Sequence, residues 1–171
     1  DAPTEGEVLI DGTEISRLPE DKLAQVRGKK IGFVFQSYQL IPTLTALENV
    51  LLPYELNANG DGKHRAISLL ETVGLADRLH HYPVQLSGGE QQRVALARAF
   101  VLGPPIVMAD EPTGNLDSKN GQHVLDLLTE RQREAKTTLV MVTHDKQIAD
   151  RADRRIMMKD GRIIADETNG N

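Results

Sequence analysis

The sequence predicts an α/β fold in which helices pack against a largely parallel sheet. Three short apolar runs, at residues 30–36, 106–109 and 137–144, have the length and composition of buried strands. Segments with helical periodicity separate these runs, and such alternation is typical of parallel sheets with crossover helices. The 171 residues are 39% hydrophobic and 26% charged, which suits one globular domain with its own core.

The first 36 residues predict a hairpin, a short helix and the first of these strands. "EVLIDGTEI" (7–15) places an Asp-Gly pair between two β-rich stretches, which is a strong hairpin signal. "PEDKLAQVR" (19–27) reads as a short helix, because proline favours the first helical turn. The strand "KIGFVFQ" follows and ends at Gln36.

Residues 37–85 predict helices and loops rather than strands. "NANGDG" (57–62) is rich in turn-forming residues and predicts a flexible connection. The helix "KHRAISLLETV" (63–73) follows, with apolar residues at helical spacing and Gly74 as its stop.

The rest of the chain predicts helices alternating with strands, and a closing hairpin. The first helix, at about 90–102, is stopped by Gly103 and two prolines. The elements expected after it are, in order, the strand at 106–109, a helix at 121–135, the strand at 137–144, a helix at 145–152, and a hairpin at 154–166 around Asp160-Gly161. We expect all three strands to be buried, and the one at 106–109 to be covered on both faces.

Polar residues stand where each predicted strand ends. Asp110 and Glu111 follow the second strand, and such an acid pair can hold Mg²⁺ through water and activate an attacking water as general base. His144 ends the third strand and could donate a hydrogen bond to a phosphate, and the Gln36 amide could touch metal or water. Each residue alone also fits a plain turn or strand cap. Because the carboxyl ends of parallel strands share one edge, the four could converge on one site.

The stretch "LSGGEQQRVALARA" places Ser87, Gly88 and Gly89 in front of a helix. Free amides at a helix start carry partial positive charge and suit a phosphate. Ser87 could equally be an N-cap that binds no ligand. Capping does not account for two consecutive glycines, which cost backbone entropy, whereas close approach of a phosphate to the backbone does.

Composition argues against several other classes of site. The net charge of −5 argues against a broad basic face for nucleic acid, and the absence of cysteine removes disulfides and cysteine-ligated metals. No apolar run is long enough to span a bilayer. The other histidines show no metal-ligand spacing and are expected at the surface; they are His64, His80, His81 and His123.

These motifs together resemble the ATPase domain of ABC transporters over essentially the whole chain. "LSGGE" with "QQRVALARA", then "VMADEP", "GNLD" and "VTHD", stand in the order and spacing of that family, and "FQSYQLIPTLTALENVLLP" is similar to its lipoprotein-release and macrolide-export branch. The resemblance implies a RecA-like parallel sheet core with a helical subdomain. It divides this single domain into core residues 1–36, the helical subdomain 37–85, and core residues 86–171.

The resemblance also implies a role for each candidate residue. Glu111 is then the general base and His144 the switch histidine, while Asp110 and the Q-loop residue Gln36 contact Mg²⁺. The nucleotide is then contacted by the signature residues Ser87, Gly88 and Gly89 and by the D-loop residue Asp117. Glu90 stands where many families have Gln, and an acid suits a helix start.

A P-loop of the form G-x-x-x-x-G-K-[ST] is absent from the 171 residues. The Gly-Lys pairs at 28–29 and 62–63 lack both the earlier glycine and the following Ser or Thr. The opening residues also read like a loop in mid-domain, so we expect an ABC-type P-loop NTPase that is truncated at its N-terminus. In the family two ATPase domains pack head to tail, so the turn at 87–89 would grip a nucleotide held by a partner.

We therefore expect an ATP-binding and ATP-hydrolysing subunit of an ABC transporter, which uses ATP and Mg²⁺ to power an integral-membrane permease of export or lipoprotein-release type. It would be cytoplasmic, peripheral on the inner face of the cell membrane, and would bind no nucleic acid. The alternative is a chain that only completes a partner's ATP site. A DNA-repair or chromosome ATPase would share these motifs, but its long heptad insertions and basic stripe are missing here.

The resemblance places the P-loop strand between the strand at 137–144 and the one that begins at 154. Without it two apolar strand edges are open, so we expect the lone chain to be unstable as a monomer. It should rearrange its sheet or pair its edges with another copy, whereas residues 37–85 should stay nearly native.

Overall fold

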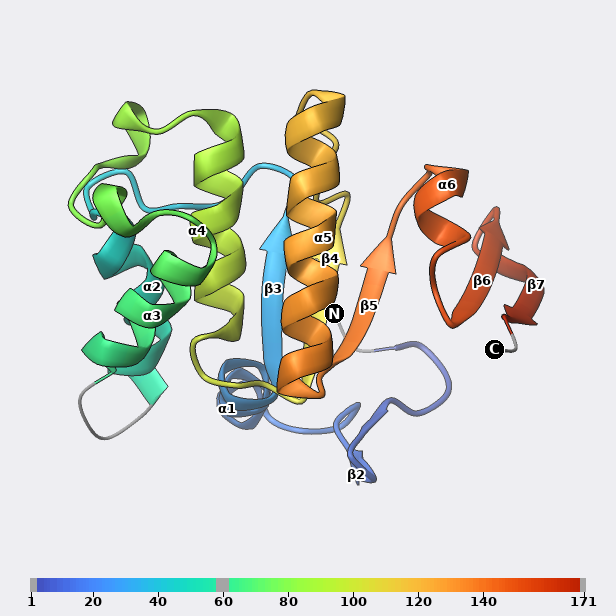
Figure 1. The fold of residues 1–171 in the computed structure, drawn as a ribbon. Coiled ribbons are helices and arrows are strands. Elements are labelled where there is room, and N and C mark those ends of the chain that lie inside the picture. Colours follow the sequence, from blue (N-terminus) through green and yellow to red (C-terminus); the bar gives the residue numbers. More distant parts are fainter. Residues whose placement is uncertain (1–2, 58–61, 170–171) are drawn as a thin grey trace.

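The computed structural model describes residues 3–57 and 62–169 (Figure 1). The strands are β1 (Leu9–Ile10), β2 (Thr13–Glu14), β3 (Ile31–Phe35), β4 (Ile106–Asp110), β5 (Thr138–Val142), β6 (Arg154–Lys159) and β7 (Arg162–Thr168). The helices are α1 (Glu20–Lys30), α2 (Ala46–Asn57), α3 (Lys63–Thr72), α4 (Gly88–Phe100), α5 (Ser118–Ala135) and α6 (Lys146–Ala149), with short 3₁₀ helices η1 (Ala76–Arg78) and η2 (Pro83–Gln85). None of the helices in these described ranges is long and apolar enough to cross a membrane.

Strands β3, β4 and β5 form a central sheet in that order, and both pairs are parallel. Their ends are level, because Phe35 lies opposite Asp110 and Asp110 lies opposite Val142. Helix α4 packs against β3, and α5 lies beside α4 on the same side of the sheet (Figure 1). The predicted α/β fold is confirmed, and the carboxyl ends of the three strands share one edge.

The opposite face of the central sheet is open in the part of the chain that the structure describes. Val34, Val107 and Ala109 belong to the core and are at most 1% exposed. Residues that point the other way are far more accessible, with Met108 36% and Val142 60% exposed. The expectation of fully buried strands was therefore wrong, because apolar composition does not tell how many faces a helix covers.

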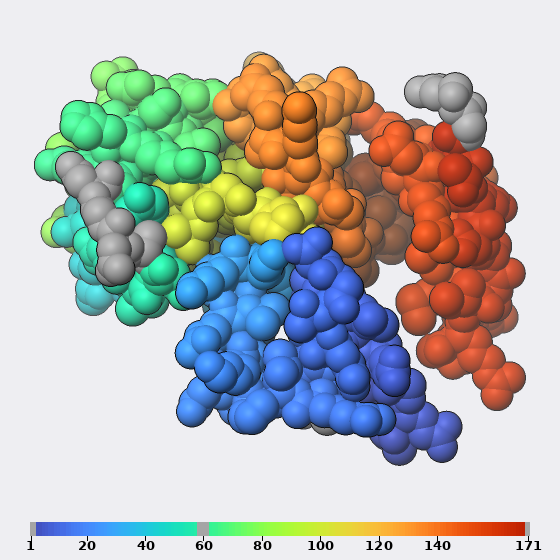
Figure 2. Space-filling view, turned by 90° about the horizontal axis from the view of Figure 1, so that it is seen from below, coloured from blue at the N-terminus to red at the C-terminus, as the bar shows by residue number. Residues whose placement is uncertain are grey.

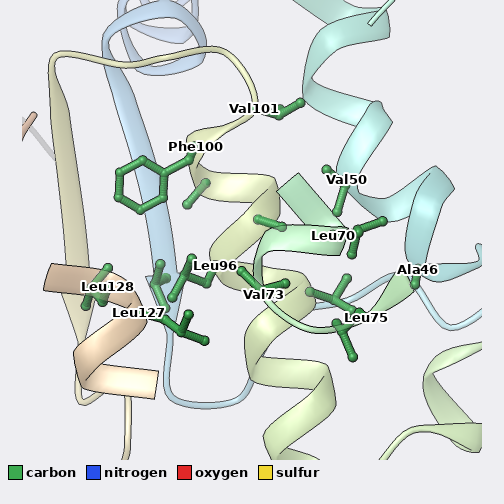
Figure 3. Packing of buried hydrophobic residues seen from close by; sticks show 14 of the residues in the cluster. Ala46, Val50, Leu70, Val73, Leu75, Leu96, Phe100, Val101, Leu127 and Leu128 are labelled. Atoms are coloured by element: carbon green, nitrogen blue, oxygen red, sulfur yellow. The ribbon is translucent and has the colours of Figure 1, made fainter. Parts of the chain in front are cut away.

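The core centres on α4, which is buried on most sides (Figure 3). Leu96 and Phe100 lie toward Leu128 of α5. Strand β3 approaches α4 very closely at Gly32, where a Cβ built on the glycine would lie 2.3 Å from the carbonyl oxygen of Ala99. This distance is well below any van der Waals contact, so only glycine fits at position 32 with this spacing between sheet and helix.

Both predicted hairpins are confirmed, since β1–β2 and β6–β7 are antiparallel pairs. The turn of the first has φ angles of 55° and 73° at Asp11 and Gly12, and that of the second has 49° and 73° at Asp160 and Gly161. Two positive φ angles in a two-residue turn are the type I′ geometry, whose twist matches that of the strands.

Most helices begin or end a few residues from the predicted positions. Helix α4 starts at Gly88 rather than at residue 90, so both glycines lie in its first turn. Helix α1 continues to Lys30, and β3 begins at the next residue. Helix α6 has only 4 residues. The predicted connection at 57–62 lies mostly outside the described residues.

The C-terminal hairpin stands to one side of the central sheet (Figures 1 and 2). Strands β6 and β7 pair with each other, and within the described ranges neither pairs with β5. Of the two alternatives expected, closure of the sheet by pairing β5 with β6 is not seen in the single chain. Pairing of the edges with another copy stays a prediction, as does instability of the lone monomer.

Candidate functional site at the carboxyl edge of the sheet

The carboxyl edge of the central sheet brings two of the predicted residues into direct contact. The Oε1 atom of Glu111 lies 3.0 Å from the backbone nitrogen of His144 and 2.6 Å from its ring Nδ1. The backbone N–H donates to the carboxylate, and the ring donates as well when Nδ1 carries a proton. The sequence predicted that both residues lie at this edge, and the structure adds that they form a pair.

Glu111 is held in an unusual backbone conformation. Its φ of 43° lies in the left-handed region, which is costly for a residue with a Cβ. Its N–H donates to the carbonyl of Val142 in β5 at 3.0 Å, and its own carbonyl accepts from Gly114 at 3.0 Å. The side chain of Glu111 is 21% exposed, whereas that of His144 is 85% exposed. A carboxylate fixed in this way beside an open imidazole can accept a proton from a molecule bound at the edge.

Gln36, directly after β3, turns toward the loop that follows β4. Its Nε2 donates to Oδ1 of Asn115 at 3.3 Å, and Nδ2 of Asn115 donates back to the Gln36 carbonyl at 3.0 Å. Gly114 makes room for this pair, since a Cβ built there would lie 2.6 Å from the Gln36 amide nitrogen. Asn115 was not predicted as a site residue; its place in the "GNLD" stretch is the signal that could have indicated it.

A metal ion at this edge would have few protein ligands. Within the described ranges, no three His, Cys, Asp or Glu side chains are placed to hold an ion together. Asp110 is exposed at the end of β4. One carboxylate suits Mg²⁺, which keeps several waters and is usually bound by one or two carboxylates together with substrate phosphates.

Of the other histidines, His81 is half-buried and three are at the surface as expected, namely His64, His80 and His123.

Ser87 is the N-cap of α4 and forms a capping box with Glu90. The Ser87 hydroxyl accepts from the Glu90 backbone at 3.3 Å and donates to Oε2 of Glu90 at 2.8 Å, and that oxygen also accepts from the Ser87 backbone at 2.8 Å. Arg78 forms a salt bridge with the other carboxylate oxygen at 3.3 Å. The capping interpretation of Ser87 is thus confirmed, while a phosphate contact, which would compete for the hydroxyl proton, stays a prediction.

The two glycines after Ser87 also have a packing role within the chain. A Cβ built at Gly88 would lie 2.7 Å from the hydroxyl oxygen of Tyr38. One built at Gly89 would lie 3.1 Å from Oδ1 of Asn120. A side chain at either position would therefore require Tyr38 or Asn120 to shift, a constraint that the sequence pattern did not reveal.

Asp117 caps the first turn of α5. Its Oδ1 accepts from the backbone nitrogens of Lys119 and Asn120, each at 3.1 Å, and its Oδ2 accepts from the Asn120 side chain at 2.5 Å. These hydrogen bonds, that from the Asn120 side chain above all, hold the pKa of the Asp117 carboxyl below its ordinary value. The structure therefore shows a helix cap, and the predicted nucleotide contact of Asp117 stays a prediction.

We expect the stability of the protein to fall steeply at acid pH, in part because of Glu90. Hydrogen bonds from the Ser87 backbone and hydroxyl, with Arg78 nearby, hold the pKa of Glu90 below its ordinary value of 4.5. A carboxyl with a lowered folded-state pKa contributes stability above its unfolded pKa, and that contribution is lost as the pH falls through the folded pKa.

Urea unfolding of the complete protein at a series of pH values between about 3 and 7 tests this linkage. Glu90→Gln can keep the capping box without titrating, so its free energy of unfolding should fall less steeply at acid pH. Glu71→Gln, which removes the same charge from an exposed position of α3, controls for net charge. Parallel curves for the native protein and Glu90→Gln would contradict the expectation.

Two polar side chains on the buried side of α4 were not predicted as site residues. Gln92 is 0% exposed, and its Nε2 donates to the carbonyls of Phe35 at 3.3 Å and Pro112 at 2.6 Å. It thus joins the end of β3 to the turn after Glu111. Its Oε1 has no partner in the described part of the chain. Its place four residues before Leu96 on one helix face could have indicated that it is buried. The other side chain is Arg98, which donates to backbone carbonyls after β3.

Comparison with known sequences gives matches over nearly the whole chain. A family model described as ABC transporter matches residues 1–114. An uncharacterized ABC transporter ATP-binding protein of Thermotoga maritima is 54% identical over 172 residues, which cover 99% of this chain and 73% of that protein. LolD of Syntrophus aciditrophicus, a lipoprotein-releasing system ATP-binding protein, is 48% identical, with 96% of this chain and 74% of LolD covered. MacB of Brucella melitensis, a macrolide export ATP-binding/permease protein, is 49% identical over 98% of this chain, which spans 26% of MacB.

Comparison with solved structures gives the same picture. The ABC transporter cassette MJ0796, solved as a dimer, superposes with a TM-score of 0.89 at 47% identity, covering 100% of this chain and 77% of that one. A second structure of MJ0796, a dimer in a post-hydrolysis state bound to ADP and Pi, matches with a TM-score of 0.89 at 46% identity.

Proposed function

Since the chain belongs to the ABC transporter family and has the fold of its ATPase cassettes, we propose that the complete protein hydrolyses ATP to power a membrane permease. Its similarity to LolD and MacB supports a transporter of lipoprotein-release or export type. The observation that carries the proposal is the pair formed by Glu111 and His144 at the carboxyl edge of the sheet. This edge is where open parallel sheets bind their ligands.

In this proposal each residue of the edge has one role. Asp110 holds Mg²⁺ through water, with Gln36 reaching the metal or its water from the end of β3. Glu111 accepts the proton of the attacking water, and its fixed backbone keeps the carboxylate in place during the reaction. His144 turns Nδ1 toward Glu111, and with a proton on each ring nitrogen its exposed ring donates from Nδ1 to Glu111 and from Nε2 to the γ-phosphate. ATP with Mg²⁺ supplies the phosphoryl group and the charge-neutralising ion, and the chain contributes positioning and proton acceptance.

We further propose that the protein acts as a head-to-tail dimer in which two ATP sites are shared. Ser87, Gly88, Gly89 and Asp117 of one chain then contact the nucleotide of the partner. The start of α4 suits this role, because its free amides and dipole favour an anion. The dimeric MJ0796 structures support such an assembly.

Mixing two inactive variants of the complete protein tests the shared site. Glu111→Gln lacks the base, and Ser87→Asp keeps an N-cap but places a negative charge where the phosphate would bind. In a mixed dimer one site contains neither change, so part of the native turnover should return. Ser87→Asn keeps an N-cap without the added charge and should lose less turnover than Ser87→Asp, and Glu71→Gln, at an exposed position of α3, is the control that should stay active. Failure of the mixture to regain turnover, with both variants folded, would argue that each site lies within one chain.

The contact with a membrane partner is proposed for the helical subdomain, residues 37–85, at the inner face of the cell membrane. A groove of about 440 Å³ lies where this segment meets the core of residues 1–36 and 86–171. Its apolar lining includes Phe33, Phe35, Leu52, Pro53, Leu56 and Leu102. Leu56 is 74% exposed, and exposed apolar surface of this kind is typical of interaction sites.

Residues 1–171 contain no P-loop motif, so we expect this polypeptide by itself to bind ATP weakly and not to hydrolyse it. The amides and lysine of such a loop supply most contacts with the phosphates of ATP. Titration with labelled ATP and Mg²⁺ measures the affinity. Binding in the range of about 1 μM, or turnover that Glu111→Gln removes, would contradict the expectation.

The same polypeptide has a second candidate function, which is to complete a partner's ATP site without hydrolysing ATP itself. The observation that favours it is the presence of the Ser87-Gly88-Gly89 turn in a sequence without a P-loop. If residues 1–171 restore turnover to the Ser87→Asp variant of the complete protein, this function is supported; no gain in turnover would exclude it.

A further inference from the structure

The segment after β3 is attached to α4 through its backbone. Arg98 donates from Nη1 to the carbonyl of Gln39 at 2.6 Å and from Nη2 to the carbonyl of Tyr38 at 2.9 Å. Gln92, nearly two turns earlier on the same helix, donates to the carbonyl of Phe35 at 3.3 Å. The two side chains of α4 therefore hold the backbone on both sides of Gln36.

The backbone held by Arg98 has a conformation that needs support. Tyr38 and Gln39 have φ angles of 59° and 50°, and neither is a glycine. Left-handed backbone is costly at residues with a Cβ and persists only where neighbouring groups fix it. The planar fork of an arginine can donate to two adjacent carbonyls at once, which the single ammonium of a lysine cannot match.

The same segment also touches the other end of α4. The hydroxyl of Tyr38 occupies the space in which a side chain at Gly88 would lie. Tyr38 is thus bound by Arg98 near the C-terminal end of the helix and packs against the turn at its start. A shift of residues 37–39 relative to the sheet would act on Arg98 and on Gly88 together.

We propose that Arg98 is a positioning residue, which binds the segment from Gln36 to Gln39 to α4 so that the Ser87–Gly89 turn moves with it. This inference rests on the proposed function and adds its regulation. A membrane partner that displaces the segment after Gln36 would thereby displace the phosphate-gripping turn of the same chain.

Distances between spin labels in the complete protein test the attachment directly. The 171 residues contain no cysteine, so cysteines at Ser37 and Val84, both exposed, can carry a label pair once any cysteine elsewhere is replaced. We expect a narrow distance distribution in the native background, a broad one in Arg98→Met and an intermediate one in Arg98→Lys. Arg93→Met is the matched control, because it removes a guanidinium from the same helix. The Nε of Arg93 has no hydrogen-bond partner in the described residues.

Dimer formation with ATP, measured by light scattering in the Glu111→Gln background, gives a second readout. Arg98→Met should raise the ATP concentration for half-maximal dimer about tenfold, Arg98→Lys should raise it less, and Arg93→Met should leave it unchanged.

Each outcome of the two measurements decides a different question. Equal distance distributions in the native protein and Arg98→Met, or equal broadening in Arg93→Met, would overturn the inference. If the native chain forms no dimer with ATP, the proposed function fails, while the label distances still decide the role of Arg98. If Arg98→Met does not fold, Arg98→Lys is compared with Arg93→Met by the same two measurements.

Discussion

Replacing Glu111 with glutamine in the complete protein should lower ATP turnover about 10²–10⁴-fold while leaving ATP binding intact. Gln can still accept the hydrogen bond that the His144 backbone donates to Oε1, so the geometry of the edge is kept. The amide cannot take the proton of an attacking water. It also carries no charge facing the phosphates, so the ATP-bound dimer should be trapped rather than weakened.

Two measurements on purified protein check this result. Phosphate release gives the turnover, and size-exclusion chromatography with and without ATP gives the oligomeric state. Glu71→Gln, at an exposed position of α3, is the control and should behave as the native protein does. Turnover by Glu111→Gln at the native rate would exclude Glu111 as the base, and a monomer in saturating ATP would contradict the trapped dimer.

Replacing Gly32 with alanine should produce the largest loss of stability among single-methyl additions to this fold. The new Cβ would meet the Ala99 carbonyl oxygen at 2.3 Å and the Ala99 carbonyl carbon at 3.0 Å. These are backbone atoms of α4 and cannot rotate away, so helix and sheet must separate. Overpacking of this kind costs about 1–3 kcal/mol, and we expect the upper end of this range.

Gly28→Ala is the matched control for this experiment. A Cβ at position 28 also meets a close neighbour, Oδ1 of Asn57 at 2.5 Å, but that atom ends a flexible side chain. Alanine is also the better helix former within α1, so this variant should stay within about 0.5 kcal/mol of the native protein or exceed it. Chemical denaturation of both variants gives the comparison, and equal midpoints would show that the sheet and α4 separate easily.

The features that the sequence could predict are those set by short stretches of chain. The Asp-Gly turns specify their hairpins locally, because glycine and aspartate tolerate positive φ. Glu111 and His144 could be placed at one edge because each directly follows an apolar run in a chain with α/β alternation. For this reason the fold class and the placement of these two residues at one edge of the sheet were predicted correctly.

The features that the sequence could not predict depend on which segments meet. Only one face of β4 is buried, because α4 and α5 lie on one side of the sheet. Met108 and Val107 are both apolar residues of one short run, so the sequence does not tell which of them is buried. The partner of Gln36 is Asn115, 79 positions further along the chain. Similarly, the spacing of Gln92 from Leu96 could indicate burial, but its hydrogen bonds to the carbonyls of Phe35 and Pro112 depend on which segments meet α4.

The packing of Gly88 and Gly89 has a consequence for how this lineage can evolve. Each glycine leaves space for a side chain of its own chain, the Tyr38 hydroxyl and the Asn120 amide. With Glu111 as the proposed base, a descendant without catalysis could change Glu111 and still keep both glycines, because a side chain at either one would require Tyr38 or Asn120 to shift. Among such relatives, substitution at Gly88 should be accompanied by a smaller residue at position 38. An intact glycine pair would then reflect packing rather than activity. Glu111, the proposed base, would be the position that distinguishes active from inactive relatives.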